Sequence, residues 1–337
     1  MKAYQLTAPQ GAAALKLTEL AEPKPAPGQV LVRVRATALN YRDLMVASGR
    51  YGAGVPLPLI PLSDGAGEIA AVGAGVTRWK AGDRVAGTFF QNWQTGPVRR
   101  EAFESALGGA INGMLAEYVA LSADGVIAIP PHLNFDEAAT LPCAALTAWH
   151  ALVTEGQIAA GQTVLLLGTG GVSLFALQFA KMHGARVIIT SSSDEKLARA
   201  KVLGADETIN YRTTPEWEKE VHDLTEKAGA DHVVEVGGNE TFPRSLRAVA
   251  MGGTISVIGG VSGFTSNVSL RDILGKSVLL RGIFVGNHDM FAAMNRAMAW
   301  HRLQPVIDQV FTFSEAPAAY RYQESGAHFG KVVITVS

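Results

Sequence analysis

Gln162–Ser193 has the sequence QTVLLLGTGGVSLFALQFAKMHGARVIITSSS, and this stretch decides the fold that we predict for the chain. Thr163–Leu167 is a short uninterrupted apolar run, which is typical of a parallel strand buried on both faces. A glycine turn follows at once, and a helical pattern over Leu174–His183 ends at Gly184. A second buried strand over Arg186–Thr190 completes the first half of a predicted nucleotide-binding sheet.

The glycine turn has the sequence GTGGVS at 168–173. A glycine turn at a helix N-terminus lets backbone N–H groups approach a pyrophosphate, and the helix dipole favours the anion. Ser173 stands at the third glycine position of the G-x-G-x-x-G pattern, so the packing of helix on strand has to accommodate an extra hydroxymethyl group. The alternative is a sharp turn without a ligand. The residues predicted to bind the cofactor here are Gly168, Gly170, Gly171 and Val172.

The end of the second strand indicates which dinucleotide is bound. An NAD enzyme usually has Asp or Glu there, roughly 20 residues after the first glycine, to hold the ribose 2′-OH. This chain has Ser191 and Ser192 there, with Lys196 just beyond. Because hydroxyl and ammonium groups suit a 2′-phosphate and a carboxylate would repel it, we predict NADPH rather than NADH. The alternative for Lys196 is an ordinary solvated helix lysine.

Two acidic residues compete with this interpretation. Asp194 and Glu195 follow the serines directly. We expect both in the first turn of the next helix, where carboxylates suit the helix dipole, with Ser192 or Ser193 as the N-cap residue.

The composition of the chain limits the classes of protein to which it can belong. A chain of 337 residues with 48% hydrophobic residues is expected to form two domains. The net charge of −1 argues against a nucleic-acid or anionic-membrane binder. Neither a secretion signal nor an apolar run of membrane-spanning length is visible, and the single cysteine fits a reducing compartment, so we expect a cytoplasmic location.

The first part of the chain is rich in strand patterns. Gln29–Leu39 alternates, with Val30, Val32 and Val34 on one face and Arg33 on the other, which predicts an amphipathic strand. After the glycine turn, apolar strand patterns alternate with helical ones, as a doubly wound parallel sheet requires.

Several motifs together resemble the medium-chain dehydrogenase/reductase superfamily, in its zinc-independent branch near the zeta-crystallin-like quinone oxidoreductases. They are ALNYRDL at 38–44, PLSDGAGEIAAVG at 61–73, AGDRV at 81–85, LPCAALTAWHAL at 141–152, GTGGVS at 168–173, LGADETINY at 203–211 and HFGKVVI at 328–334. The resemblance implies an α/β fold in which a Rossmann doubly wound parallel sheet is inserted in a GroES-like β-rich catalytic domain. The implied boundaries are 1–145 and 286–337 for the catalytic domain and 146–285 for the NADP-binding domain.

The resemblance also bears on metal binding. The zinc-dependent relatives use Cys, His and Cys as catalytic ligands, and by motif these positions are Asn40, Ser63 and Cys143 here. Only Cys143 is a good zinc ligand, whereas a zinc site needs three or four such donors. The four cysteines of the family's structural zinc lobe have no counterpart after Val85. We therefore predict no bound metal.

Catalysis without a metal needs hydrogen-bond donors for a developing oxyanion. Asn40 and Tyr41 lie where the metal would have been, so we predict both as catalytic residues. Asn40 donates either to the substrate oxygen or to the nicotinamide ribose, and Tyr41 either donates its proton or forms a wall of the pocket. Arg42 adds a positive charge nearby or points to solvent. His150 is an alternative acid or base, or a structural histidine.

Further cofactor contacts follow from the resemblance alone. It implies that Thr147 lies next to the cofactor and Tyr211 near the adenosine end. It implies that the ends of the last strands reach the nicotinamide, at Ile258, Phe284, Val285 and Gly286. Lys331 is predicted at the cofactor phosphate, with a solvated turn as the alternative. The edge strand Ser277–Ile283 would join the sheet of a partner and give a homodimer.

These features predict an NADPH-dependent, zinc-independent oxidoreductase that reduces small apolar enones or quinones, because such substrates need only hydride delivery and modest stabilisation of an oxygen. One alternative is an alcohol dehydrogenase or carbonyl reductase of the same superfamily. Another is a non-catalytic structural or RNA-binding relative, although the chain lacks the excess of basic residues that RNA binding favours.

Overall fold

The computed structural model describes residues 1–52 and 54–336. The chain divides into two compact units. Met1–Leu146 and Val285–Ser337 form one, which we call the outer unit, and Thr147–Phe284 form the other, the inserted unit. The two crossings lie one residue away from the predicted boundaries at 145/146 and 285/286.

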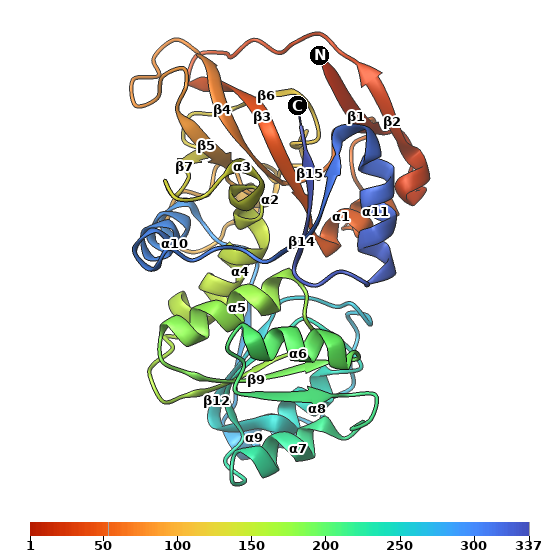
Figure 1. The fold of residues 1–337 in the computed structure, drawn as a ribbon, viewed down its shortest axis with the longest axis vertical. Coiled ribbons are helices and arrows are strands. Elements are labelled where there is room, and N and C mark those ends of the chain that lie inside the picture. Colours follow the sequence, from red (N-terminus) through yellow and green to blue (C-terminus); the bar gives the residue numbers. More distant parts are fainter. Residues whose placement is uncertain (53, 337) are drawn as a thin grey trace. The chain divides into compact units, whose positions relative to one another are not determined.

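The inserted unit contains a six-stranded parallel sheet (Figure 1). Its strand order is β10-β9-β8-β11-β12-β13, which is the order of a doubly wound nucleotide-binding fold. The strands are β8 (Thr163–Leu166), β9 (Arg186–Ser191), β10 (Glu207–Asn210), β11 (Ala230–Glu235), β12 (Val249–Val257) and β13 (Leu279–Gly282).

Helices cover both faces of this sheet, with α5 and α6 on one face and α7, α8 and α9 on the other (Figure 1). They are α5 (Gly171–Met182), α6 (Asp194–Val202), α7 (Trp217–Leu224), α8 (Phe242–Ala248) and α9 (Leu270–Lys276). Because the central strands are covered on both sides, Val164, Leu165 and Leu166 are all fully buried. This confirms the prediction that an uninterrupted apolar run forms a central parallel strand.

Some element ends differ from the sequence prediction. The helical pattern over Glu216–Ala228 predicts a helix that continues to Ala228, but α7 ends at Leu224. Glu226 and Lys227 have φ values of 51° and 73°, in the left-handed region that no helix continues through. α9 was not predicted, since none of its residues is buried and its sequence carries no clear helical periodicity.

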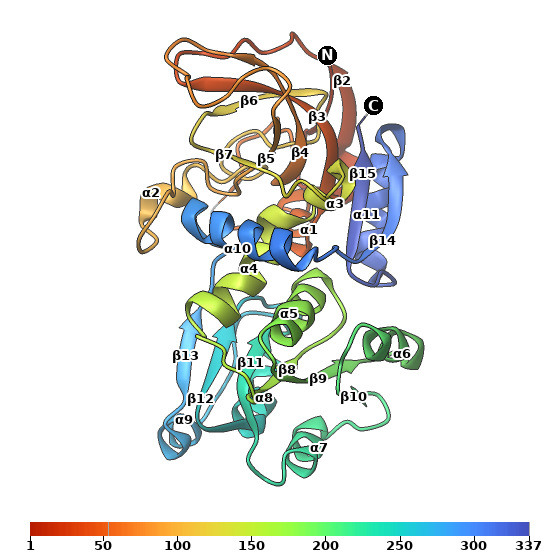
Figure 2. The ribbon, with the colours of Figure 1, turned by 60° about the vertical axis from the view of Figure 1, so that its left-hand side comes forward.

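The outer unit is built on a seven-stranded sheet (Figure 2). The strand order is β14-β15-β3-β4-β5-β7, and β6 pairs with β3 outside this path. The strands are β3 (Gln29–Leu39), β4 (Asp64–Val72), β5 (Arg84–Gly87), β6 (Tyr118–Ser122), β7 (Val126–Ala128), β14 (Ile307–Thr312) and β15 (Lys331–Thr335). The last strand of the chain, β15, therefore pairs antiparallel with β3, with Val332 opposite Leu39.

The predicted amphipathic strand over Gln29–Leu39 is confirmed as β3. Val30, Val32 and Val34 are buried, and Arg33 is exposed. Further along the strand both faces become buried, so that Thr37 has no exposed surface. The carboxyl end of β3 thus carries polar groups into the interior of the outer unit.

The remaining elements complete the outer unit. At the N-terminus, β1 and β2 form an antiparallel pair. These elements are β1 (Lys2–Leu6), β2 (Leu15–Glu19), α1 (Tyr41–Ala47), α2 (Arg100–Phe103), α3 (Phe135–Ala138), α10 (His288–His301) and α11 (Ala316–Ser325). The chain enters the inserted unit through α4 (Leu146–Trp149). Wider helical turns lie on both sides of α4, at Leu141–Ala145 and at His150–Thr154. No helix of the described residues is both long enough and apolar enough to cross a membrane.

Candidate active site

The glycine turn of the inserted unit joins β8 to α5. Gly168 has φ of +72°, a conformation that favours glycine, and Gly170 is the N-cap residue of α5 with extended backbone. A Cβ atom added at Gly168 or at Gly170 would meet no other atom within 4 Å. At Gly170, therefore, neither backbone conformation nor packing within the protein requires a glycine.

Such open space fits a dinucleotide. The first N–H groups of an α-helix have no partner within the helix, and α5 has no side-chain cap at Gly170. Gly171 and Val172 are the first two residues of this helix. Ser173 turns its hydroxyl away from the turn, since its Oγ donates to the carbonyl oxygen of Leu167 at 2.7 Å. The residues present therefore fit a pyrophosphate at this helix N-terminus.

The end of β9 carries the hydroxyl groups that the sequence indicated. Ser191 is the last residue of β9 and is 3% exposed. Ser193 is the N-cap residue of α6, because its Oγ accepts from the N–H of Lys196 at 3.3 Å. Asp194 lies in the first turn of α6 as expected, and its Oδ1 accepts from Asn210 at 2.7 Å.

The structure brings Tyr211 to the same edge as the serines. Its backbone N–H donates to the carbonyl oxygen of Ser191 at 3.0 Å, and its side chain is 42% exposed. Ile258, which follows β12, is half-buried, and its N–H donates to the carbonyl oxygen of Glu235 at 2.9 Å. Thr147 is buried in α4.

The return crossing carries the other three predicted cofactor residues. Phe284 is 38% exposed at the end of the inserted unit. Val285 begins the second part of the outer unit and has φ of +50°, an uncommon conformation for a β-branched residue. A Cβ added at Gly286 would lie 2.8 Å from Cγ of Leu146, so packing inside the outer unit already requires a glycine there.

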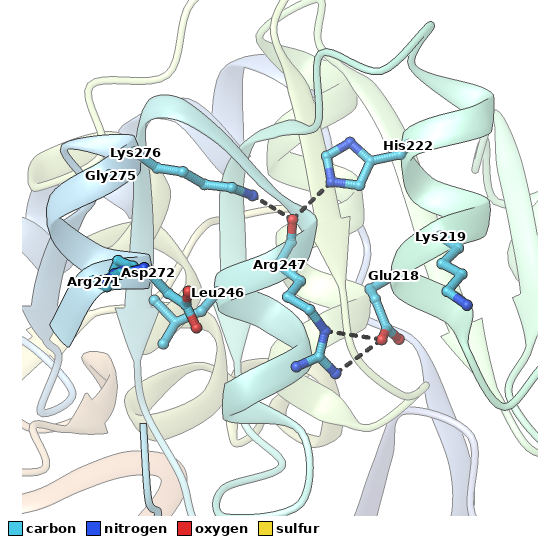
Figure 3. A pocket seen from close by; sticks show the side chains of 9 residues that line it. All are labelled: Glu218, Lys219, His222, Leu246, Arg247, Arg271, Asp272, Gly275 and Lys276. Atoms are coloured by element: carbon cyan, nitrogen blue, oxygen red, sulfur yellow. Dashed lines mark hydrogen bonds and ion pairs between the residues drawn. The ribbon is translucent and has the colours of Figure 1, made fainter. Parts of the chain in front are cut away.

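A pocket of about 500 Å³ in the inserted unit lies away from the glycine turn, between α7, α8 and α9 (Figure 3). Glu218 accepts from both Nε and Nη2 of Arg247, at 3.0 and 2.9 Å. The ammonium of Lys276 and Nε2 of His222 both donate to the Arg247 carbonyl near the end of α8. Since β12 begins just after, at Val249, this pocket lies at the amino edge of the sheet, whereas ligands of such folds bind at the carboxyl edge.

The outer unit contains a buried polar cluster at the end of β3. Asn40 follows β3 and is the N-cap residue of α1. Its backbone N–H donates to Oδ2 of Asp43 at 2.8 Å, and its side chain is buried. Burial raises the pKa of the Asp43 carboxyl from 3.8 to about 6, although the neighbouring Arg42 guanidinium acts in the opposite direction.

Arg42 points inward and not to solvent, and it pairs with Asp43. Its Nη1 lies 3.4 Å from Oδ1 of Asp43 and donates to the carbonyl oxygen of Leu107 at 2.9 Å. The guanidinium carbon lies 4.8 Å from the ring centroids of both Tyr51 and Phe89. The guanidinium is therefore enclosed by two aromatic rings, an arrangement that stabilises a buried cation.

Asp64 is the second buried carboxylate of this cluster. Its Oδ1 accepts from Ser63 Oγ at 2.8 Å and its Oδ2 from the backbone N–H of Cys143 at 3.3 Å. Burial raises its pKa, while Lys331, the Asn40 amide and these hydrogen bonds lower it. The pKa of the Cys143 thiol is raised strongly, first by burial and then by Asp64, which favours the neutral thiol over the thiolate.

The ammonium of Lys331 is buried in the same cluster. Lys331 is the first residue of β15 and is 2% exposed. Its Nζ donates to the carbonyl oxygen of Leu39 and to Oδ1 of Asn40, both at 2.6 Å, and lies 3.7 Å from Oδ2 of Asp64. The expected contact with a cofactor phosphate finds no support in this geometry, because the ammonium is already surrounded by acceptors of the outer unit.

The residues at the three family ligand positions do not fit a zinc ion. They offer an amide, a hydroxyl and a thiol whose pKa is raised, whereas zinc takes imidazole, thiolate and carboxylate groups. A positive charge already stands beside the one carboxylate there, Asp64, because Lys331 lies 3.7 Å away. Among the described residues there is no group of three or more His, Cys, Asp or Glu side chains that could hold a metal.

Tyr41, His150 and the aromatic pair Phe89 and Phe90 lie in different surroundings. Tyr41 opens α1 and is half-buried. His150 is buried in the inserted unit, with Nε2 at 4.0 Å from Glu155, as a structural histidine would be. The aromatic residues Phe89 and Phe90 are 1% and 2% exposed, so core packing accounts for them without a ligand.

Sequence reasoning missed the interior position of Lys331 and the aromatic enclosure of Arg42. Lys331 and Arg42 look like surface residues in the sequence, because long charged side chains seldom lie fully buried. The one available signal was charge balance, since Asp43 and Asp64 lie in apolar surroundings and need cations nearby.

Comparison with known proteins gives the family. The alcohol dehydrogenase GroES-like domain family matches residues 26–131, and the zinc-binding dehydrogenase family matches residues 171–300. A zinc-type alcohol dehydrogenase-like protein of Schizosaccharomyces pombe is 47% identical over 92% of this chain and 91% of its own length. The chain therefore belongs to the medium-chain dehydrogenase/reductase superfamily of oxidoreductases, and its α/β fold with a GroES-like domain agrees with the prediction.

Relatives within the superfamily carry several names. A quinone oxidoreductase of Pseudomonas aeruginosa is 35% identical over 82% of this chain and 79% of its own length. The crystal structure of an NAD-dependent alcohol dehydrogenase superposes with a TM-score of 0.92, at 36% identity over the whole of both chains. The 2-octenoyl-CoA carboxylase reductase CinF, solved in complex with NADP and 2-octenoyl-CoA, is 27% identical with a TM-score of 0.88, covering 99% of this chain and 87% of that one.

Proposed function

We propose that this protein is an NADPH-dependent reductase of enones or quinones that works without a metal. The observation that carries this proposal is the buried Asn40 amide, whose Oδ1 accepts from Lys331 and whose Nδ2 is a donor. An amide and an ammonium lie at 2.6 Å from each other where the zinc-dependent relatives hold their metal. Hydrogen-bond donors suffice for a conjugated carbonyl, whose oxygen gains charge gradually as hydride adds to the distant carbon.

The proposal assigns one role to the glycine turn and another to Asn40. The glycine turn at 168–173 holds the pyrophosphate, and bound NADPH supplies a hydride to the substrate. Asn40 donates from Nδ2 to the substrate oxygen, and a proton from solvent completes the reduction. Nδ2 is buried and interacts with Asp64, and because an amide NH₂ group has two N–H donors, one donor remains for a substrate.

The choice of NADPH is supported by the edge after β9. Ser191 and Ser192 offer hydroxyls there, while Asp194, the first acidic residue after them in the chain, accepts a hydrogen bond from Asn210. A carboxylate at the end of the strand would repel a 2′-phosphate and attract a ribose hydroxyl. Replacing Ser191 by Asp is therefore expected to weaken NADPH binding and to strengthen NADH binding, as measured by fluorescence titration of each reduced cofactor.

The decisive experiment is a substrate panel. The purified protein is given NADPH with enones, quinones and saturated ketones, and oxidation of the cofactor is followed by absorbance with and without a chelator. We expect turnover of enones or quinones that the chelator does not change, and a metal content far below one per chain. Turnover confined to saturated ketones or alcohols would instead establish the second candidate, an alcohol dehydrogenase or carbonyl reductase, which the names of two relatives favour.

We also propose that the protein is a homodimer joined through β13. This strand lies at the edge of the parallel sheet, and its residues Leu279 and Leu280 are 53% and 39% exposed. Leu270 and Leu274 on the adjacent α9 are 78% and 81% exposed. An apolar edge of this kind needs a cover, and a second copy supplies an identical edge. Light scattering coupled to gel filtration should give twice the chain mass, and Leu279→Arg should give the monomer.

A further inference from the structure

The ammonium of Lys331 is held by acceptors in three directions. It donates to the carbonyl oxygen of Leu39 and to Oδ1 of Asn40, each at 2.6 Å, and Oδ2 of Asp64 lies at 3.7 Å. A lysine ammonium has three N–H donors and no acceptor. With the side chain 3% exposed, these groups satisfy it and leave it little freedom to turn to another ligand.

This contact determines which way the Asn40 amide faces. Because an ammonium only donates, the atom of Asn40 that it meets has to be the carbonyl oxygen Oδ1. The other amide atom is then the nitrogen Nδ2, and its hydrogen bond to Asp64 helps to lower the pKa of that carboxyl. Without the ammonium, the amide could rotate and present its oxygen where a donor is needed.

The backbone beside this amide is held as well. The N–H of Asn40 donates to Oδ2 of Asp43 at 2.8 Å, and the N–H of Asp43 donates to the Asn40 carbonyl oxygen at 3.0 Å. The pairing of Val332 with Leu39 brings Lys331 beside Asn40. The capping contacts of α1 thus fix the main chain of Asn40, and Lys331 fixes its side chain.

We propose that Lys331 is a positioning residue, whose hydrogen bond to Oδ1 holds the Asn40 amide with Nδ2 as the donor to the substrate oxygen. The same ammonium neutralises Asp64, which would otherwise oppose a developing negative charge on the substrate. This inference rests on the proposed function, since it assigns a purpose to the donor that the proposed reaction uses.

Four variants test this role: Asn40→Ala, Lys331→Met, Lys331→Arg and the double variant Asn40→Ala/Lys331→Met. Losing one oxyanion donor usually lowers kcat by about 100-fold or more, so we expect roughly this effect for Asn40→Ala and about 10- to 100-fold for Lys331→Met. The double variant should be no slower than Asn40→Ala, because Lys331 acts through Asn40. Lys331→Arg, which keeps the charge and donors, should recover part of the loss.

Two measurements separate positioning from other roles. The Kd for NADPH should stay within about twofold of the parent in Lys331→Met, whereas a lysine on the cofactor phosphate would lose about tenfold or more. In the cofactor-free protein, the side-chain NH₂ signals of ¹⁵N-labelled Asn40 should shift or broaden in Lys331→Met. Asn40→Ala assigns these signals, and unchanged signals would contradict the inference.

A charge-balanced variant keeps the test possible if the single variant does not fold. If Lys331→Met does not fold, Asp64→Asn/Lys331→Met removes both charges together and takes its place in every comparison. The role of Lys331 would be overturned, with the role of Asn40 unaffected, by either of two results. One is that the losses of kcat in Asn40→Ala and Lys331→Met add up in the double variant. The other is that Lys331→Met binds NADPH more weakly and keeps the parent kcat. If Asn40→Ala kept the parent kcat on every substrate, the proposed function of Asn40 would fail first and the inference with it.

Discussion

The glycine turn and the buried cluster around Asn40 are built in opposite ways. The turn uses six consecutive residues, 168–173, and what it offers is backbone N–H groups and open space. The cluster uses side chains from segments far apart in the chain, and the Lys331 ammonium donates to a carbonyl 292 residues away, at Leu39. A site made of backbone depends on conformation, and a site made of buried side chains depends on charge balance.

This difference predicts different responses to mutation. Two cations, Arg42 and Lys331, and two carboxylates, Asp43 and Asp64, are all buried in the outer unit. Removing one partner leaves an uncompensated buried charge, which is among the most damaging changes to a protein. At Gly170 in the turn, where φ is negative and a Cβ meets no other atom, a small side chain should leave the fold intact and affect only the ligand.

The largest expected effect is on the stability of the cluster. Lys331→Met should lower the free energy of unfolding by about 3 to 5 kcal/mol, because Asp64 loses the cation that faces it. Adding Asp64→Asn should recover most of this loss. Urea denaturation near neutral pH measures both variants, and a single variant as stable as the parent would show that the cluster does not depend on charge balance.

The second effect is a dependence of stability on pH. The Asp43 carboxyl has a pKa of about 6 when folded, above its ordinary 3.8, so its stabilising contribution is full below about pH 4 and is lost as pH rises through 6. Relative to Asp43→Asn, the parent should lose on the order of 3 kcal/mol between pH 4 and pH 7. Denaturation curves across this range measure the difference.

An exposed carboxylate provides the control for this titration. Glu22→Gln changes the same charge at the surface and should leave the pH dependence of the parent unaltered. A constant difference between the parent and Asp43→Asn at all pH values would mean that Asp43 titrates normally in the folded protein.

The third effect concerns the turn. Gly170→Ala should weaken NADPH binding by about 10- to 100-fold, since the methyl group enters the space that the pyrophosphate needs. The melting temperature should not fall, because the added Cβ meets nothing within 4 Å and φ is negative. Gly275→Ala on α9 is the matched control, because its Cβ also meets nothing within 4 Å. Equal losses of affinity in both variants would disconnect the turn from the cofactor.

The smallest effect tests the serine at the third glycine position. Ser173→Ala removes the hydrogen bond to the Leu167 carbonyl and should cost about 1 kcal/mol of stability. NADPH affinity should be unchanged, because this hydroxyl faces the strand and not the turn. Thermal denaturation and a cofactor titration on the same sample check both statements, and a more stable variant would show that the hydroxyl only crowds the helix.

Much of the inserted unit was predictable because its signals are local. The apolar run over Thr163–Leu167 predicts a buried strand, GTGGVS at 168–173 predicts the turn, and Ser193 with Asp194 predicts the start of α6. All three are present. The end of α7 was not predictable in this way, because the left-handed backbone at Glu226 and Lys227 has no signature in those residue types.

In the cluster, the sequence indicated the position of Asn40 but not its surroundings. Arg42 and Lys331 are residue types that usually face solvent, and Phe89 is equally suited to a core or to a substrate pocket. Whether each of these side chains faces solvent, the core or a pocket depends on segments that meet only after folding.

By itself, the sequence determined the α/β fold, the glycine turn and the absence of good zinc ligands at two of three family positions, because these follow from periodicity and residue chemistry within short segments. Tertiary structure alone decided that Lys331 faces Asn40 and Asp64. That contact requires β15 to pair with β3 across almost the whole length of the chain, and no local pattern encodes the neighbour that a buried charge will find.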